Sequence, residues 1–268
     1  MMKNLILNQV YSTKKNFIKS ILFIFSLNVF QLISILNQGK LDKLDIKPLD
    51  FFIKIYGGVQ SDFFIFQYIH WIVIICTLLF IVENIINSYK GLDFMIINRS
   101  GFRLKWWCSK IISLFLLNII YLIVIIIIHK ALTLLFLYPA DYKIWSAYSK
   151  IYYNDLYNST MNPYKLFFIC LCIMLTGFIA ITSFFQTINV ITNNNIKIFI
   201  VLIIIIIING ILYMNNLIPR VMSPLNYPSI LDIKPNIYNY LKYIDANIVL
   251  ILFNTIVGSI FIIKKDIL

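Results

Sequence analysis

The chain has 268 residues, of which 60% are hydrophobic and 13% are charged, and its mean hydropathy is +0.86. Soluble domains are about half apolar and roughly a quarter charged, so this composition excludes an ordinary soluble fold and favours an integral membrane protein. The net charge of +12 does not indicate nucleic-acid binding, because the basic residues lie in short connections between apolar runs rather than along one face.

The first predicted element is a basic amphipathic helix in "NLILNQVYSTKKNFIKS", residues 4–20. It leads directly into the first apolar run. That run is longer than the core of a usual secretion signal, and no small-x-small cleavage site follows it. The sequence therefore predicts a signal anchor that stays in the membrane.

Six apolar runs are long enough, or nearly so, to cross a membrane, because about 20 apolar residues span a hydrocarbon core of ~30 Å. The predicted spans are residues 18–37, 63–85, 111–129, 165–186, 197–215 and 247–263. Residues 131–138 either continue the third helix or form an interfacial piece. The chain is thus predicted to be all-α, a single transmembrane domain over residues 1–268 with six transmembrane helices.

The distribution of lysine and arginine sets the predicted orientation. The basic residues divide almost equally between the two sides, but the segments on the side of the N-terminus are shorter and so have the higher basic density. On the other side the positive charge is interleaved with aspartates. We therefore expect both termini in the cytoplasm.

Between the second and third spans lies "INRSGFRLKWWCSK", residues 97–110, with four basic residues around Trp106 and Trp107. Each arginine or lysine at a bilayer centre costs ~2.5–3.5 kcal/mol. This cost predicts a surface position, with the tryptophans at the headgroup level and Lys110 facing lipid phosphates.

The preceding residues 87–102 contain a short helical stripe of Leu92, Met95 and Ile96, bracketed by Gly91 and Gly101. Two interpretations are open for this predicted cytoplasmic helix. It is either an orientation-setting segment on the inner leaflet or a docking helix for a soluble partner.

The order of residues here resembles the first cytoplasmic loop of permeases in the ABC-2 type exporter family. The residues that carry the resemblance are Glu83, Gly91, Ile96, Ile97, Arg99, Arg103 and Lys110. The basic amphipathic start is similar to the membrane-parallel N-terminal helix of that family, and residues 216–246, with four prolines, match the place of its partly re-entrant outer element.

The resemblance implies a coupling helix that fits a cleft of a separate ATPase subunit. The residues implied in this contact are Gly91, Leu92, Met95, Ile96, Arg99, Gly101, Arg103 and Lys105. It also implies a second permease subunit, identical or different. ATP and magnesium would belong to the ATPase chain, and this chain would bind no cofactor of its own.

The sequence has no G-x-x-x-x-G-K-[ST] motif, so ATP binding in a P-loop would require another polypeptide. It also has no H-E-x-x-H or G-x-S-x-G motif, which argues against an enzyme. The four cysteines are scattered and predict neither a disulfide nor a metal site. His70 and His129 are interpreted as interfacial helix-end residues.

Glu83 is the only acidic residue inside a predicted span, near the inner end. It either reaches water at the helix end or pairs with Arg99 or Arg103. Uncharged polar residues within the spans are candidates for a substrate pathway, although such groups more often bond a neighbouring helix. These candidates are Asn28, Gln31, Asn118, Thr182 and Asn209.

Residues 138–164 are dense in tyrosine, which an aromatic belt at the outer headgroup level explains. The bias toward isoleucine, asparagine, lysine and tyrosine suggests an AT-rich bacterial genome. The prediction is therefore an exporter permease of the bacterial cytoplasmic membrane, moving a hydrophobic or amphipathic peptide, lipid or drug. The alternative is a membrane immunity or sensor protein that binds a peptide and transports nothing.

Overall fold

The computed structural model describes residues 2–58, 65–86, 103–137, 142, 144–158, 161–192, 195–219, 222–231 and 233–264. Within these ranges the regular structure is helical. Six long helices make up the bundle: α2 (Lys14–Asp42), α4 (Ile65–Ile86), α6 (Arg103–Phe136), α9 (Pro163–Thr192), α10 (Asn195–Met214) and α11 (Ile237–Lys264).

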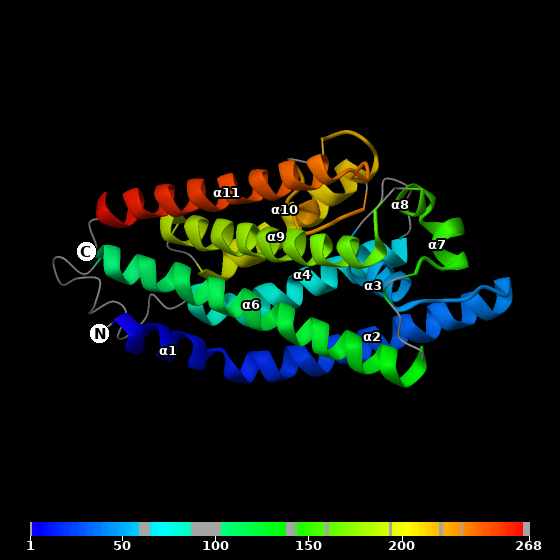
Figure 1. Cartoon of the computed structure of the whole chain (residues 1–268). Helices are drawn as coiled ribbons and strands as arrows, with labels where there is room; N and C mark the ends of the chain where they lie inside the picture. The colour runs from blue at the N-terminus through cyan, green and yellow to red at the C-terminus, as the bar shows by residue number, and fades with distance from the viewer. Residues whose placement is uncertain are drawn as a thin grey trace.

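The long helices run alongside one another, and both termini lie at the same end of the bundle (Figure 1). Helix α1 (Met2–Ser12) precedes α2, and the connections contain α3 (Pro48–Tyr56), α7 (Ala147–Tyr152), α8 (Asn154–Tyr157) and the 3-10 turn η2 (Pro224–Asn226). Helices α3, α7 and α8 gather at the end opposite the termini. We call the two ends the terminal end and the far end.

In the part of the chain that the structure describes, four helices are long and apolar enough to cross a membrane: α2, α6, α11 and residues Pro163–Ile191 of α9. This confirms the all-helical prediction and gives four candidate membrane-spanning helices, which coincide with the first, third, fourth and sixth predicted spans. The second and fifth predicted spans also fall on helices, but their apolar parts in the described chain, Gln67–Glu83 and Ile203–Met214, are shorter. Residues 131–136 continue α6, which decides between the two alternatives for that run.

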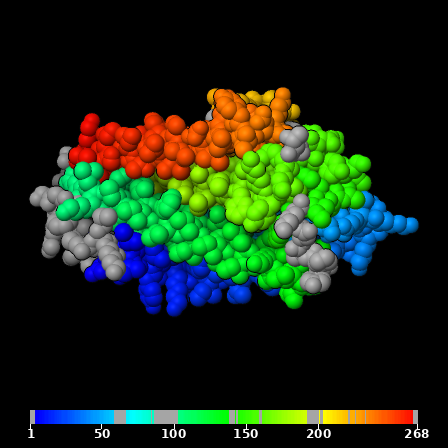
Figure 2. Space-filling model, in the orientation of Figure 1, coloured from blue at the N-terminus to red at the C-terminus, as the bar shows by residue number. Residues whose placement is uncertain are grey.

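The outside of the bundle is apolar, as expected for a surface that faces lipid. Phe30 on α2 and Val249 and Phe253 on α11 are each more than 60% exposed. In α9, 61% of the membrane-spanning window is buried, against 22% in α11. Helix α9 therefore lies at the centre, and Figure 2 shows α11 along one border of this face and α1 and α2 along the other.

Helix α1 leads into α2 through a single turn residue, Thr13, whose backbone remains right-handed helical. The side chain of Gln9 reaches from α1 to the first turns of α6. A helix at the N-terminus is confirmed, but it ends at Ser12, and Lys14, Lys15 and Lys19 of the predicted element belong to α2. Helix α1 packs against the bundle through this polar contact, whereas the resemblance implied a helix lying along the membrane surface.

A close contact joins α9 to the proline-containing segment between α10 and α11. A Cβ atom added at Gly177 would lie 2.3 Å from the backbone N of Pro228, so only glycine fits there. The Nδ2 of Asn247 on α11 donates to the carbonyl of Tyr227 at 3.1 Å and to Oγ1 of Thr176 at 3.2 Å. The segment is thereby fixed to both helices.

At the far end a buried carboxylate holds α3 against α7. Asp50 is fully buried; its Oδ1 accepts from the hydroxyl of Ser149, and its Oδ2 accepts from the backbone N–H of Lys47 at 2.7 Å. Burial raises the pKa of Asp50 above its usual value, and the hydrogen bonds from Ser146, Ser149 and Lys47 oppose that shift.

Because of this raised pKa, the Asp50→Asn variant is expected to lose part of the pH dependence of stability. The folded protein protonates Asp50 at a higher pH than the unfolded chain does, so it binds more protons over that interval. The stabilisation is complete below the ordinary value of 3.8 and is lost as the pH rises through the folded pKa. Thermal unfolding from about pH 4 to about pH 7 measures it, with exposed Asp155→Asn as the control. Equal pH slopes in the two variants would contradict the assignment.

Some tyrosines of the predicted aromatic belt lie inside the protein. Tyr148 is fully buried and donates its hydroxyl to Oε1 of Gln38 on α2 at 3.1 Å. Tyr153 is also buried, and Tyr152 stacks on Tyr148 with ring centroids 4.4 Å apart. Tyr148 and Tyr153 therefore belong to the core between α7 and the bundle, where a surface position was expected.

Candidate functional site

The candidate site is the start of α6, where the sequence concentrates basic and aromatic residues. We call Arg103, Trp106, Trp107, Ser109, Lys110 and Ser113 the basic junction. Helix α6 begins at Arg103, and Trp106, Trp107 and Lys110 are at most 1% exposed. The predicted surface position of the tryptophans and the predicted contact of Lys110 with lipid phosphates are therefore wrong.

Lys110 can be buried because the protein itself supplies a hydrogen-bond acceptor and an aromatic ring for its ammonium group. Its Nζ donates to the carbonyl of Ile85 at 2.7 Å and lies 5.2 Å from the ring centre of Trp106. Ile85 is in the last turn of α4, where carbonyl groups lack partners within the helix and the helix dipole is negative. The ammonium group therefore fixes α6 to the end of α4.

Trp107 and Arg103 connect the junction to α11. The indole N–H of Trp107 donates to the carbonyl of Thr255 at 3.0 Å, and its ring lies against Gly258. A Cβ at Gly258 would be 2.1 Å from that ring, so a side chain there would displace the indole. The Nη1 of Arg103 donates to the carbonyl of Ile263 at 3.0 Å.

Gln9 connects the junction to α1. Its Oε1 accepts from the hydroxyl of Ser113 at 2.7 Å, and its Nε2 donates to Oγ of Ser109 at 3.4 Å. The two serines are four residues apart and so share one face of α6. With Lys110 and Trp107, these contacts bind α1, α4 and α11 to the first turns of α6.

The structure describes only part of the predicted ATPase contact. Arg103 is half-buried at the junction and Lys105 is exposed. Gly91, Leu92, Met95, Ile96, Arg99 and Gly101 lie outside the described residues. The described chain resumes at Arg103 after α4 ends at Ile86, so both ends of the 87–102 segment join the terminal end of the bundle.

Glu83 lies in the last turn of α4 and is half-buried. Arg103 is placed against the end of α11, and Arg99 lies outside the described residues. The predicted pairing of Glu83 with one of these arginines stays a prediction.

The predicted pathway residues make contacts that a helix-packing role explains. The Nδ2 of Asn118 donates to Oγ1 of Thr182 at 2.9 Å, and Asn28 accepts from the hydroxyl of Tyr56 at 2.7 Å. Asn209 donates to the carbonyl of Ile205 in its own helix, and Gln31 is buried in α2. Their role in a substrate pathway stays a prediction.

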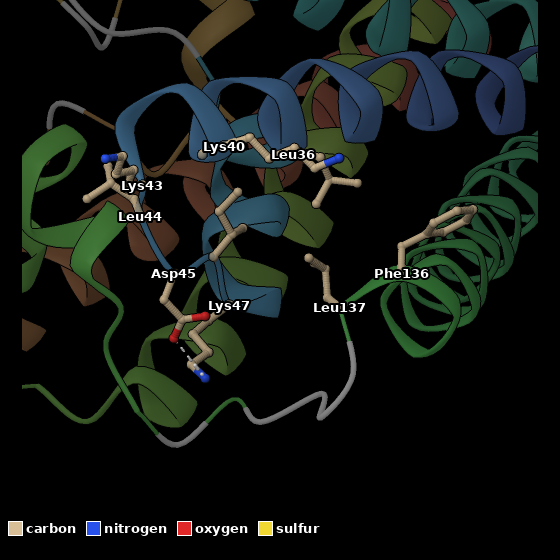
Figure 3. Close-up of a pocket in the computed structure, with 10 residues that line it drawn as sticks. Leu36, Lys40, Lys43, Leu44, Asp45, Lys47, Phe136 and Leu137 are labelled. Carbon is tan, nitrogen blue, oxygen red and sulfur yellow. Dashed lines mark ion pairs between the residues drawn. The ribbon is translucent and has the colours of Figure 1, made fainter.

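None of these five residues lines either of two pockets that open on the described surface, one at the far end and one between α2 and α4. The first, about 400 Å³, lies at the far end beside the last turn of α2 (Figure 3). Its lysines do not converge, because Lys47 pairs with Asp45 at 3.1 Å and Lys43 points away from Lys40. The second, about 360 Å³, lies between α2 and α4.

Both histidines are interior residues, contrary to the interfacial position expected for them. His70 is 5% and His129 is 1% exposed. His129 lies among the rings of Phe51, Phe52 and Tyr56, with the Phe51 ring stacked at 5.1 Å. It therefore contributes to the packing of α3 against α6.

No protein-family model, curated protein or solved structure matches this chain.

Sequence reasoning missed the part that Gln9, Ser109 and Ser113 play in the junction. The available signal was the pair of small polar residues four apart at the start of an apolar helix, a pattern typical of helix–helix contact. The position of Gly258 on α11 carried the same kind of signal, since glycine permits close approach of another helix or a large ring.

Proposed function

We propose that this chain is the permease subunit of an ATP-driven ABC-2 type exporter in the bacterial cytoplasmic membrane. In this proposal α4 and α10 are also spans, which gives six transmembrane helices. Both termini and the 87–102 segment face the cytoplasm. A separate ATPase chain binds residues 88–105 and hydrolyses ATP.

The observation that carries the proposal is the hydrogen bond from Lys110 to Ile85. It ties together the two helices that flank the 87–102 segment, close to both of its ends. A force applied to that segment is therefore transmitted to α4 and α6 as one unit, and through Trp107 and Arg103 to α11. Such rigid attachment is what a coupling element between a motor and a membrane pathway requires.

The proposed cycle follows from these connections. Closure of two ATPase subunits on ATP moves the 87–102 segments of two permease subunits, identical or different. The junctions then shift α4, α6 and α11 and change access to a pathway between the subunits. The apolar and aromatic character of the bundle favours a hydrophobic or amphipathic cargo, either a peptide, a lipid or a drug.

Retention of an ATPase tests the proposal. The tagged full-length chain is purified in mild detergent from its native cells, and mass spectrometry searches the complex for a polypeptide with a P-loop. Vanadate-sensitive ATP hydrolysis is measured after reconstitution into liposomes. We expect stoichiometric retention that falls at least about tenfold in the double variant Arg99→Glu, Arg103→Glu, because a loss of ~1.4 kcal/mol is tenfold.

The control is Lys150→Glu with Lys165→Glu, two exposed lysines toward the far end of the bundle. It should retain the ATPase fully. Labelling of a cysteine at Ser100, in a chain whose native cysteines are replaced, tests the orientation independently. Absence of any P-loop chain, equal loss in both double variants, or labelling at residue 100 from outside intact cells would each overturn the proposal.

A further inference from the structure

A side pocket between α2 and α4 lies toward the terminal end of the bundle. Its volume of about 360 Å³ is within the range of small-molecule sites, ~300–1,000 Å³. The walls are apolar: Phe23 and Phe80 are 48% and 38% exposed, so the pocket opens on the outer surface of the bundle. An occupant therefore comes from within the bilayer.

Two groups at this pocket are suited to bind a polar head. Lys19 lies at the rim and is exposed, and no described carboxylate is within ion-pair distance of it. Ser20 lines the wall and is 3% exposed, and its Oγ makes no hydrogen bond to any described residue. A buried hydroxyl without a protein partner is uncommon, and this one is available to donate to an oxygen of a ligand.

The helices around the pocket are held in place. The Nδ2 of Asn16, one turn before Ser20, donates to the carbonyl of Phe80 at 3.2 Å. On the other side, Oγ1 of Thr77 donates to the carbonyl of Ile74 at 2.7 Å and lies 2.9 Å from the hydroxyl of Tyr121 on α6. The pocket is therefore preformed.

We propose that this pocket binds an acidic phospholipid from the leaflet at the terminal end of the bundle. The phosphate lies against Lys19, an oxygen of the head or ester region accepts from Ser20, and one acyl chain runs between Phe23 and Phe80. Charge complementarity selects this occupant, because basic pockets between transmembrane helices favour anionic headgroups and the apolar walls require a hydrocarbon chain. The inference goes beyond the proposed exporter function and does not depend on it.

The wall of the pocket contains a natural reporter, the half-buried thiol of Cys76. A lipid in the pocket covers this thiol. The full-length protein is placed in nanodiscs of phosphatidylcholine alone or of phosphatidylcholine mixed with phosphatidylglycerol, and alkylation by N-ethylmaleimide is followed at each cysteine. We expect Cys76 to react several-fold more slowly in the phosphatidylglycerol mixture, while exposed Cys172 on α9 reacts equally in both.

Native mass spectrometry of the same samples counts the bound phosphatidylglycerol. Lys19→Gln should reduce its retention about fivefold, the effect of one surface lysine near acidic lipid, and should abolish the protection of Cys76. Ser20→Ala should reduce retention by a smaller factor. The matched control is Lys14→Gln, which removes the same charge from the same helix end on another face, where Lys14 lies over the ring of Tyr11.

Lys19 is exposed, so its substitution leaves the bundle intact, and unchanged thermal unfolding of Lys19→Gln verifies this. Protection of Cys76 by phosphatidylglycerol that requires Lys19 supports the proposal. Equal alkylation of Cys76 in both lipid mixtures would overturn it. So would a loss of bound phosphatidylglycerol in Lys14→Gln equal to the loss in Lys19→Gln.

Discussion

Replacing Lys110 by glutamate is expected to destabilise the protein more than any other single charge change in α6. The new carboxylate would face the carbonyl of Ile85, and two acceptors cannot hydrogen-bond each other. The site is fully buried, so the charge would also lose its hydration. An uncompensated buried charge costs ~3–5 kcal/mol. For a chain of this size that lowers the unfolding temperature by roughly 6–20 °C, at about 2–4 °C per kcal/mol.

Thermal unfolding of the detergent-solubilised protein and its level in isolated membranes measure this effect. The matched control is Lys130→Glu, which makes the same change at an exposed position in the same helix. Lys110→Met separates the charge from the contact, because it removes the ammonium without burying a new charge. Its effect should be smaller, since loss of the hydrogen bond to the Ile85 carbonyl costs ~1–3 kcal/mol and no new charge is buried. Equal stability of Lys110→Glu and Lys130→Glu would refute the buried position of Lys110.

The variant Gly177→Val is expected to separate the segment around Pro228 from α9. The first atom of any side chain at this position meets backbone atoms of Tyr227 and Pro228 at 2.3–2.5 Å, and backbone cannot move aside by a rotamer change. Overpacking of this kind costs ~1–3 kcal/mol and occasionally more. The hydrogen bond from Asn247 to the carbonyl of Tyr227 is expected to break as the segment shifts.

The expected result is a fall of roughly 2–12 °C in the unfolding temperature, together with faster protease cleavage between α10 and α11. Cys172→Val serves as the control because Cys172 is exposed on the same helix and receives the same side chain. If Gly177→Val unfolds and is cleaved like the control, the close approach of the two segments is absent in solution.

The long helices were predictable from hydropathy alone, but their ends were not. The sixth span was predicted at 247–263, whereas α11 begins at Ile237. The additional residues, "IYNYLKYIDA", are too polar for a hydropathy window to include, yet they continue the same helix. Similarly, α6 begins at Arg103, eight residues before the predicted third span, and its 34 residues extend ~51 Å, well beyond a hydrocarbon core of ~30 Å.

The basic junction was located by the sequence but its geometry was not. The insertion cost that placed Lys110 at the surface applies to a charge surrounded by lipid. The actual surroundings come from α1, α4 and α11, which lie up to about 150 residues away in the chain and leave no periodic signal in α6. Likewise, nothing in "NFIKSILF" distinguishes Ser20, whose hydroxyl lacks a partner, from other serines in apolar helices.

The contact between Lys110 and Ile85 also bears on how the chain enters the bilayer during translation. The carbonyl acceptor leaves the ribosome 25 residues before the lysine that binds it. A lone helix with this lysine would partition into lipid against a penalty of ~2.5–3.5 kcal/mol, but α4 is already synthesised when α6 emerges. The favourable order of biogenesis is therefore insertion of α4 and α6 together as a helical hairpin, with the acceptor always made before the donor.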